Sequence, residues 1–358
     1  MKSILSKIQT SAHALWNASS FLSQTRIAID LGTSMTRIGI DDKGIVLREP
    51  TFVGHNVRTG QALFLGDEAK QIYGKAPEFI KIVKPFENSI ISDFDSTVAL
   101  VREFLRKSVY PYYNSSLIKK GLAAYTAVPS SSTEVEQKAL REALLKAGFN
   151  SAYLLDRTVV SAIGSGQNIF TNKPVFIVDM GAGSVEVALI IMGGIVNAKV
   201  LKVGGDHMDK LIYNYLHLKY GLIIGEQTAE HLKNDLYSLS DSKAVKPIRG
   251  KSLENGLPKS VRVTSNDIRE ALSIPLNQII DGIKELIETS PPEIIDGLIK
   301  SGAVLCGNLA AVPGIDTFIM NEVKIPVSVA KHPEDAAVRG ILELCKDEEK
   351  LKRALIQR

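Results

Sequence analysis

The chain has 358 residues, which is enough for two ordinary domains or for one large body with two lobes. Hydrophobic residues make up 45% and charged residues 23%, as in globular proteins with substantial cores. The 43 basic and 39 acidic residues leave a formal net charge of +4 and form no dense basic stripe, so we expect no nucleic-acid partner. The two cysteines, Cys306 and Cys345, lie far apart, which argues against a disulfide framework and a zinc site and favours a reducing cytosol.

Residues 1–25 differ in composition from the rest of the chain. They contain lysines but no acidic residue, the first of which is Asp30, and their apolar residues recur at helical spacing. This pattern predicts an amphipathic helix that lies on a membrane surface, with Trp16 at the depth of the headgroups. A disordered tail and a helix packed on a neighbouring subunit are the alternatives. Under the membrane hypothesis, deletion of residues 1–24 abolishes co-sedimentation with anionic liposomes.

Short strands and helices alternate through the first half of the chain. Residues 26–54 contain three stretches typical of strands, and the Asp-Lys-Gly break between the second and third predicts a hairpin. A polar segment then extends to about residue 93. Beyond it, helices are predicted over 95–110, 132–148 and 158–166, and strands over 121–131 and 151–156. Ser132 or Thr133, together with Glu136, is expected to cap the second of these helices.

The second half begins again with strands. A meander over 173–206 turns at Gly193 and Gly194, and the polar, basic segment 236–262 predicts a hairpin of a small subdomain. Both halves open with a similar strand-turn-strand unit that helices follow. We therefore expect an α/β fold with two duplicated lobes that face each other. Helical patterns in this half cover 207–221, 225–239, 265–289 and 334–358.

The same acidic turn occurs once in each half. In "IAIDLGTSMTRIGI" (27–40) an apolar strand ends on Asp30 and turns at once through Gly32 and Thr33. In "FIVDMGAGSVEVALI" (176–190) Asp179 is followed by glycines and a serine in nearly the same order. A single Asp-x-Gly turn is common in hairpins and carries little information. Two copies, followed by "VGGD" (203–206), predict a site built by both lobes.

The chemistry of these turns fits a nucleoside triphosphate. Glycines allow backbone N–H groups to converge on phosphate oxygens, and the hydroxyl groups of Thr33, Ser34 and Ser184 are further donors. The carboxylates of Asp30 and Asp179 repel phosphate, but they suit a hydrated Mg²⁺ ion, which takes few protein ligands. We therefore predict that the two turns hold a triphosphate and its metal between the lobes.

The order of the motifs resembles the actin-like ATPase superfamily and, within it, the bacterial MreB cell-shape proteins. The resemblance runs from Arg26 to about Leu344, and its clearest segments are "IDLGTSMTRIGIDDKGIVLREPTFV", "VDMGAGSVEVALI" and "VGGDHMDKLIYNYLHLKYGLIIGEQTAEHLK". It implies an actin-like fold of four subdomains around a cleft that holds ATP and Mg²⁺. It also implies double filaments at the inner face of the cell membrane, in the cytoplasm, with cell-wall or division machinery as partners.

The resemblance also implies domain boundaries. An N-terminal extension of residues 1–25 precedes two lobes, each of which carries a small subdomain. The first lobe takes in 26–165 and 331–358, with its small subdomain at about 55–92, and the second takes in 166–330, with its small subdomain at about 206–263.

Site residues follow from the resemblance by position. Asp30, Asp179 and Ser184 are the expected catalytic residues, and the two aspartates are the expected metal ligands. Glu230 and Lys233 match residues that line the adenosine pocket. The remaining nucleotide-binding residues are Gly32, Thr33, Ser34 and Met35 in the first phosphate loop, Gly181, Ala182 and Gly183 in the second, and Gly204, Gly205, Asp206, Gly307 and Asn308 nearby.

The chain departs from the resemblance where catalysis is expected. MreB proteins usually carry a Glu-Pro pair after the strand equivalent to "YLLD", and that glutamate positions the attacking water; here Arg157 and Thr158 occupy these places. Arginine stays cationic and accepts no proton, but it binds phosphate well, so it would hold ATP without cleaving it. Asp156 is a poor substitute, because the next residue along a strand points the opposite way.

Other departures lie near the adenosine and the phosphates. Of three glycines expected near the adenosine only Gly307 is present, because Asn308 and Leu309 fill the next places, and the leucine is expected to crowd the pocket. Met35 replaces a usual asparagine, and Ala182 a usual glycine. Together these changes predict a divergent relative with impaired hydrolysis and weakened nucleotide binding.

The leading hypothesis is an ATP-binding, MreB-like filament protein of the cytoskeleton. A nucleotide-free scaffold that keeps the fold is the main alternative, and calorimetry with Mg·ATP separates the two. A sugar kinase is less favoured because no catalytic aspartate beside a substrate pocket is evident. A chaperone ATPase is less favoured because the chain ends where a peptide-binding domain would begin.

Overall fold

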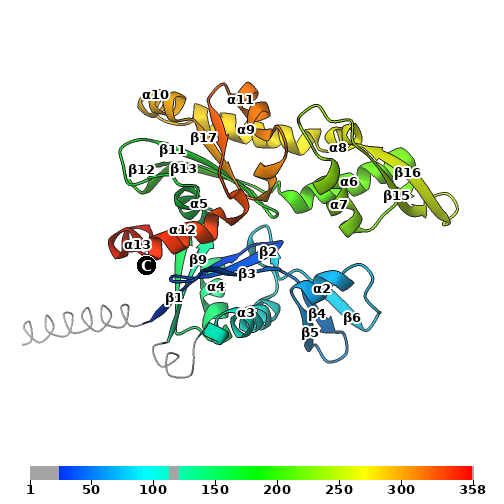
Figure 1. The fold of residues 1–358 in the computed structure, drawn as a ribbon, viewed down its shortest axis with the longest axis horizontal. Coiled ribbons are helices and arrows are strands. Elements are labelled where there is room, and N and C mark those ends of the chain that lie inside the picture. Colours follow the sequence, from blue (N-terminus) through cyan, green and yellow to red (C-terminus); the bar gives the residue numbers. More distant parts are fainter. Residues whose placement is uncertain (1–23, 113–120, 357–358) are drawn as a thin grey trace, which may run out of the picture.

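The computed structural model describes residues 24–112 and 121–356. The amphipathic helix predicted for residues 1–24 therefore lies outside the described residues, apart from its last position. Within the described ranges, every helix is too short or too polar to cross a membrane. Two large α/β bodies lie one above the other, and a smaller unit extends from each of them on the same side (Figure 1).

The first large body, called the first lobe here, is built on a sheet in the order β10-β9-β1-β2-β3. β1, β2 and β3 are antiparallel neighbours, and β9 and β10 continue the sheet in parallel on the other side of β1. The predicted hairpin is thus confirmed. The strands are β1 (Thr25–Leu31), β2 (Met35–Ile40), β3 (Gly44–Pro50), β9 (Leu122–Val128) and β10 (Ser151–Asp156).

The second lobe repeats this arrangement around a sheet in the order β13-β12-β11-β17-β18. Here too the first strand, β11, has an antiparallel meander on one side and parallel strands on the other. The predicted duplication is visible in this repeated order. The strands are β11 (Val175–Met180), β12 (Val185–Ile191), β13 (Gly194–Leu201), β17 (Ala303–Cys306) and β18 (Val327–Val329).

Helices cover the outer face of each sheet. α3 (Phe94–Ser108) and α4 (Glu134–Ala147) pack on the first sheet, and their apolar residues form its main core. α4 begins with the expected capping box, in which Thr133 and Glu136 bond to each other's backbone. α9 (Ser273–Glu288) covers the second sheet together with α10 (Pro292–Ser301) and α11 (Ile315–Val323) (Figure 1).

Two further helices fill the space between the sheets. α5 (Arg157–Gly164) packs against the inner face of the second sheet, and α12 (Ala336–Cys345) packs against the inner face of the first. The two helices also contact each other closely, because Gly164 and Gly340 face the backbone of the opposite helix. α5 therefore begins at the interface between the lobes.

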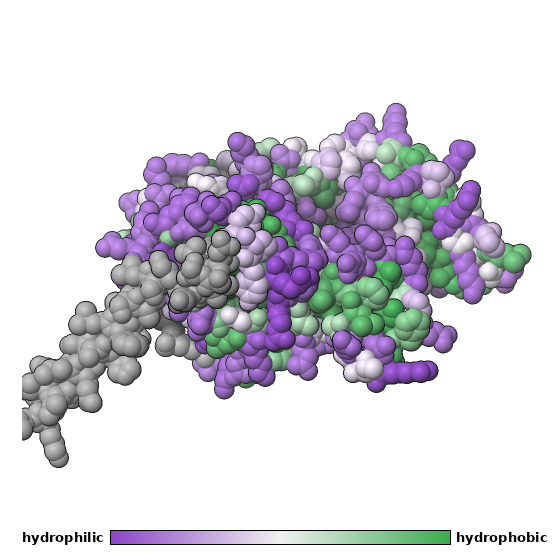
Figure 2. Space-filling model, turned by 60° about the horizontal axis from the view of Figure 1, so that its bottom comes forward, coloured by the Kyte–Doolittle hydropathy of each residue, from purple (hydrophilic) through white to green (hydrophobic). Residues whose placement is uncertain are grey.

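The first small unit extends from the first lobe. Its sheet has the order β5-β4-β6, and the unit consists of β4 (Val53–Asn56), β5 (Ala62–Leu65), α2 (Asp67–Ile72) and β6 (Ile80–Val83). The third strand expected within 26–54 therefore divides, because residues 51–52 lead from the large sheet into the small one. Apolar side chains gather on the exposed side of this unit (Figure 2), where Val57, Leu63 and Phe79 are exposed.

The second small unit extends from the second lobe and contains the predicted hairpin. This hairpin is formed by β15 and β16, which pair over their whole length. The unit consists of α6 (Gly205–Tyr220), β14 (Leu222–Ile223), α7 (Glu226–Leu236), β15 (Val245–Ser252), β16 (Pro258–Thr264) and α8 (Ser265–Ala271).

Two helical patterns are interrupted in the structure. The stretch predicted over 265–289 divides at Leu272 into α8 and α9, because Pro275 in the first turn of α9 has no N–H to bond back to residue 271. The stretch predicted over 334–358 divides into α12 and α13 (Glu348–Ala354), since the side chain of Asp347 caps a new helix by accepting from Lys350 N. Short elements complete the fold: β7 (Phe86–Glu87), β8 (Ile90–Ile91), and 3₁₀ turns at Tyr110–Tyr112, Asn308–Ala311 and Pro333–Asp335.

Candidate functional site

A cavity of about 260 Å³ lies between the lobes where the two acidic turns face each other. Asp30 and Asp179, each at the end of the first strand of its sheet, line the same space. A second hollow of about 580 Å³ adjoins it and shares lining residues with it, among them Thr33, Gly183 and Asp206. Among the site residues that the sequence predicts, all except Gly204 line the smaller cavity.

The two turns have the same backbone structure and lie against each other. Gly32 N donates to Met35 O at 3.1 Å, and Gly181 N donates to Ser184 O at 2.9 Å. A Cβ atom on Gly183 would lie 2.3 Å from Thr33 Oγ1, so only glycine fits at this point of contact. Gly204 has a similar role behind the second turn, since its Cβ would lie 2.3 Å from Ala182 O.

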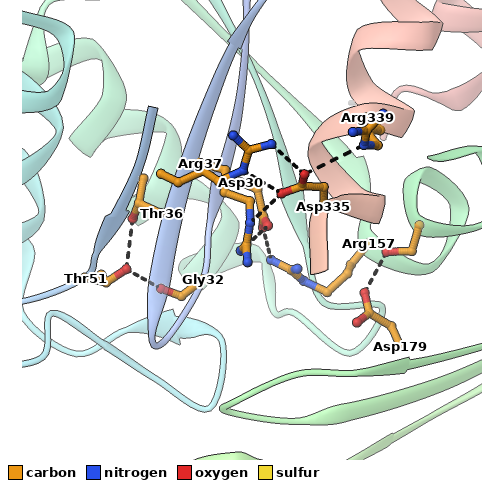
Figure 3. Close-up of polar contacts among 11 residues, drawn as sticks. Asp30, Gly32, Thr36, Arg37, Thr51, Arg157, Asp179, Asp335 and Arg339 are labelled. Atoms are coloured by element: carbon orange, nitrogen blue, oxygen red, sulfur yellow. Dashed lines mark hydrogen bonds and ion pairs between the residues drawn. The ribbon is translucent and has the colours of Figure 1, made fainter. Parts of the chain in front are cut away.

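Side chains outside the motifs hold the turns in place. Thr51 Oγ1 donates to Gly32 O at 2.8 Å and contacts Thr36 Oγ1 at 2.9 Å (Figure 3). On the other side, Ser89 N donates to Thr33 Oγ1 at 3.1 Å, and Ser89 Oγ lies 3.0 Å from Ser184 Oγ. Two of the three hydroxyl groups that we expect to face phosphate, those of Thr33 and Ser184, therefore bond to Ser89 in the turn between β7 and β8.

The carboxylate of Asp30 is enclosed by arginines. Arg157 Nη2 donates to Asp30 Oδ1 at 3.0 Å, and Arg37 Nη1 lies 3.6 Å from Asp30 Oδ2 (Figure 3). Arg37 reaches this position because it is directly opposite Asp30 in the pairing of β1 with β2. Both oxygens of this buried carboxylate thus face a guanidinium group.

Arg157 lies among several buried carboxylates. It is the first residue of α5, and its Nε is 3.8 Å from Glu186 Oε1 on β12. Burial alone would lower the pKa of Arg157, but the charges of Asp30, Asp179 and Glu186 outweigh this effect and raise it. Neither Arg157 Nε nor Glu186 Oε1 has a hydrogen-bond partner within the described ranges.

The two carboxyl groups of the second lobe, Asp179 and Glu186, are buried where the charged form is unfavourable. Burial raises the pKa of Asp179, although Arg157 and a 2.6 Å hydrogen bond from Ser161 Oγ act in the opposite direction. Burial likewise raises the pKa of Glu186 to about 8. The ionised form of each group is therefore costly in this site, and Arg157 is the cation that offsets part of the cost.

Neighbouring Asp156 serves a local purpose. Its carboxylate caps α5 by accepting from the backbone N–H groups of Thr158 and Val159. This bond fixes the first turn of α5 and with it the position of Arg157. Asp156 does not line the cavity, as the sequence leads us to expect.

Ion pairs join the two small units across the mouth of the cavity. Lys70 on α2 binds Glu230 on α7 at 2.9 Å, and Lys84 binds Asp206 on α6 at 3.0 Å. Burial alone would raise the pKa of Glu230, but the hydrogen bond and charge of Lys70 lower it overall. Tyr73 also donates to Glu226, and Gln227 Nε2 donates to Lys70 O.

Lys233, on α7 of the second small unit, also lines the cavity. It is almost fully buried, donates to Gly205 O at 2.8 Å and forms an ion pair with Asp209 at 2.8 Å. Burial raises the pKa of Asp209 to about 6 despite this lysine. Cationic side chains on β2, α2, α5 and α7 thus line the cavity.

Comparison with known proteins decides the family. A family model described as "MreB/Mbl protein" matches residues 24–353. The chain belongs to the MreB/Mbl family. The cell shape-determining protein Mbl of Bacillus subtilis (strain 168) is 36% identical over 320 residues, which cover 88% of this chain and 93% of that protein. The cell shape-determining protein MreB of Escherichia coli (strain K12) is 34% identical over 320 residues, with coverages of 88% and 91%.

Solved structures show the same actin-like fold, as the resemblance predicts. MreB5 of Spiroplasma citri bound to AMPPNP superimposes with a TM-score of 0.86 at 27% identity, covering 92% of this chain and 98% of that one. The MamK double helical filament has a TM-score of 0.75 at 18% identity, covering 90% and 99%, and it supports the fold alone. The family and the fold are therefore established.

The geometry gives this MreB/Mbl member an unusual environment for a metal. A hydrated Mg²⁺ needs carboxylate oxygens that are free to bind the ion or its waters. In this chain both oxygens of Asp30 face arginines, and Asp179 Oδ2 accepts from Ser161. The side chains of Asp30 and Asp179 as they lie here therefore do not fit the metal site that the sequence predicts.

The structure also places the remaining departures from the family pattern. Gly307 has a φ of 80°, and a Cβ there would lie 2.7 Å from Asp179 Oδ1, so this glycine is required. Leu309 lines the cavity but is only 6% exposed and packs into the core of the second lobe. The crowding expected from its side chain is thus reduced, because most of it points into that core.

Several residues at the site do not emerge from the sequence analysis. Arg37 and Glu186 each lie opposite the aspartate of their turn, at register positions Asp30–Arg37 and Asp179–Glu186, and the repeat of this spacing was a usable signal. Asp335 has no such signal. Its buried carboxylate binds Arg37 at 3.1 Å and Arg48 at 2.7 Å and thereby anchors Arg37 beside Asp30 (Figure 3).

Proposed function

We propose that this MreB/Mbl protein binds adenine nucleotides in the cavity between its lobes and assembles into cytoskeletal filaments that determine cell shape. The observation that carries the proposal is the meeting of both acidic turns, with their glycines and cationic neighbours, at one cavity. The relative MreB5, 27% identical, was solved with AMPPNP, and the curated relatives are named as cell shape-determining proteins. We infer that the same type of ligand enters this cavity.

The residues of the chain have distinct roles in this proposal. The backbone N–H groups of the two turns and the hydroxyl groups of Thr33, Ser34 and Ser184 bind phosphate oxygens. Lys233 and Glu230 line the part of the cavity beyond Gly205, where we place the adenosine. The glycines allow the backbone to approach the ligand.

We further propose that ATP hydrolysis is slow. Arg157 stands where the resemblance leads us to expect the glutamate that positions water, and a guanidinium cannot accept a proton. Its donors are directed at Asp30, and the adjacent Asp156 is committed to the cap of α5. General-base catalysis contributes about 10²–10⁴-fold to such reactions, so its loss is large enough to measure.

Phosphate release tests this part of the proposal. We expect Arg157→Glu to hydrolyse ATP at least about tenfold faster than the unmodified chain, because the carboxylate restores an acceptor. Arg262→Glu makes the same charge change at an exposed position of β16 and serves as the matched control. Equal rates for Arg157→Glu and the unmodified chain would reject impaired hydrolysis. If that variant unfolds, the unmodified chain is compared instead with an MreB/Mbl relative that carries the glutamate.

Filament formation and membrane association belong to the same proposal. MamK, whose fold is shared, was solved as a double helical filament, and negative-stain imaging with nucleotide checks whether this chain also assembles. The membrane helix of residues 1–24, the location at the inner face of the membrane and the contact with cell-wall or division machinery stay predictions. The division into lobes and small subdomains at the expected residues likewise stays a proposal.

A nucleotide-free scaffold is the second candidate. The observation that favours it is the pairing of Asp30 with Arg157, together with the hydrogen bonds that Ser89 makes to Thr33 and Ser184. Calorimetry with ATP separates the candidates. Binding below millimolar concentrations supports the leading proposal, and no detectable binding at millimolar nucleotide supports the scaffold.

A further inference from the structure

We propose that Arg157 takes the place of the divalent cation in this chain, so that nucleotides bind without a metal. The inference rests on the proposed nucleotide-binding function and concerns how the charge of the phosphates is balanced. It starts from the disagreement between the metal that the motifs predict and the carboxylates as the structure arranges them.

The first step is the position of the guanidinium. Arg157 lines the cavity between Asp30 of the first lobe and Glu186 of the second, at 3.0 and 3.8 Å from their oxygens. Its side chain is 11% exposed, while those of Asp30 and Glu186 are 5% and 1% exposed. The guanidinium group of Arg157 thus lies between acidic side chains of both lobes, Asp30 and Glu186, where the motifs predict a metal ion.

The second step is the state of the two aspartates. Asp30 has a guanidinium nitrogen at each oxygen, and Asp179 accepts from Ser161 on one oxygen. The other oxygen of Asp179 lies 2.7 Å from the position that a Cβ on Gly307 would take, beside the backbone of that glycine. A dication that entered here would have to displace these contacts and approach the charge of Arg157, which repels it.

The guanidinium group of Arg157 can also bind phosphate directly. An arginine has five N–H donors in a planar fork that matches phosphate oxygens, and it keeps its charge when buried. The bond to Asp30 uses Nη2, and the buried Nε lies 3.8 Å from Glu186 Oε1 without a hydrogen bond within the described ranges. Lys70 and Lys233 line the same cavity as further cations, paired there with Glu230 and Asp209. The chain therefore carries its own cations for the phosphates.

The primary experiment needs no variant. We measure the affinity of the unmodified chain for ADP and AMPPNP by calorimetry, once with excess Mg²⁺ and once with excess EDTA. We expect the two dissociation constants to agree within about threefold, which corresponds to only a small change in the binding free energy. Binding that is about tenfold or more weaker in EDTA would overturn the inference but leave the proposed function intact. No binding in either condition would overturn both.

Variants then assign the effect to Arg157. We expect Arg157→Gln to bind nucleotide about tenfold or more weakly in EDTA and to regain affinity when Mg²⁺ is added, since Asp30 Oδ1 is then free to bind the ion or one of its waters. Arg157→Lys should retain part of the binding in EDTA, and Arg262→Gln should match the unmodified chain. Thermal unfolding of each variant verifies the fold. An Arg157→Gln protein that binds equally well in EDTA would overturn the role of this arginine.

Discussion

Arg157 and Glu186 come from different elements, the first turn of α5 and the start of β12, and they meet at 3.8 Å inside the protein. The arginine is charged throughout the physiological range, whereas burial shifts the titration of the glutamate toward neutral pH. Three carboxyl groups, those of Asp30, Asp179 and Glu186, surround the one guanidinium group of Arg157. The protonation state of Glu186 therefore affects the stability of the fold.

We predict that Glu186 makes the protein less stable as the pH rises. Its pKa is about 8 in the folded protein and its ordinary value is 4.5, so the folded form holds a proton that the unfolded form has released. Between about pH 5 and pH 8 this difference lowers the free energy of unfolding as the pH increases. In Glu186→Gln that contribution is absent, and its Tm should fall less over the same interval, by about 2 °C or more.

Differential scanning fluorimetry at several pH values makes this comparison. Asp209, whose pKa is raised to about 6, contributes a similar slope, but it does so in both proteins and cancels in the difference. Glu254→Gln, at an exposed position of the β15–β16 hairpin, is the matched control and should behave like the unmodified chain. Parallel Tm curves for the unmodified chain and Glu186→Gln would contradict the prediction.

The residues that the sequence could predict at the site are those of short, repeated motifs. Asp30, Asp179 and the glycines could be found because the members of each motif lie within a few positions of one another and the motif occurs once in each half of the chain. Asp335 could not, since it is 298 positions from Arg37 in the chain and meets it only in the fold. Ser89 is similar, because a serine in a polar loop says nothing about a contact with Ser184 on the other lobe.

At the scale of elements, the contact between α5 and α12 is unusually close. A Cβ on Gly164 would lie 1.8 Å from Ala336 O, and one on Gly340 would lie 1.8 Å from Val160 O. Each helix therefore uses a glycine to let the backbone of the other approach. Because α5 also carries Arg157 at its start, this contact fixes the guanidinium relative to the first lobe.

We predict that Gly340→Ala destabilises the protein by about 1–3 kcal/mol or more, since the methyl group forces α12 away from the carbonyl of Val160. Urea unfolding followed by circular dichroism measures the change. Gly194→Ala is the control, because its nearest contact would be an ordinary 3.7 Å from Ile191 O. A loss for Gly340→Ala no larger than that of the control would show that the helices separate at little cost.

Elements were predictable from sequence where local rules decide them. The capping box of α4, the β2–β3 hairpin and the meander of the second lobe follow from neighbouring residues, and the structure confirms them. The separation of β4 from the large sheet was not predictable, because it depends on pairing with β5 and β6. The divisions after α8 and α12 were marked by Pro275 and Asp347, which a strict reading of helix start signals would have identified.

At the scale of the whole molecule, the duplication of α/β lobes was predictable because one motif occurs twice, and both lobes show the same strand order. The actin-like fold itself was predicted from the resemblance to the MreB proteins. The closeness of the two small units was not predictable. It depends on Lys70, Lys84, Asp206 and Glu230, whose side chains cannot be matched across the cleft from sequence alone. In the structure these side chains are about a quarter exposed, and Lys84, Asp206 and Glu230 line the larger hollow beside the cavity.

Because these ion pairs are partly exposed, we expect the distance between the two small units to depend on the salt concentration. Partly solvated ion pairs contribute only about 0–1 kcal/mol each and weaken as counterions screen them. We therefore expect the radius of gyration of the ligand-free protein, measured by small-angle X-ray scattering, to increase as KCl rises from about 0.05 to 0.5 M. Lys70→Gln with Lys84→Gln should show the expanded value already in dilute buffer. An unchanging radius would mean that packing alone sets the distance between the two small units. An increase would mean that the salt concentration of the surroundings controls how far the two units open, and with it how readily the proposed nucleotide enters and leaves.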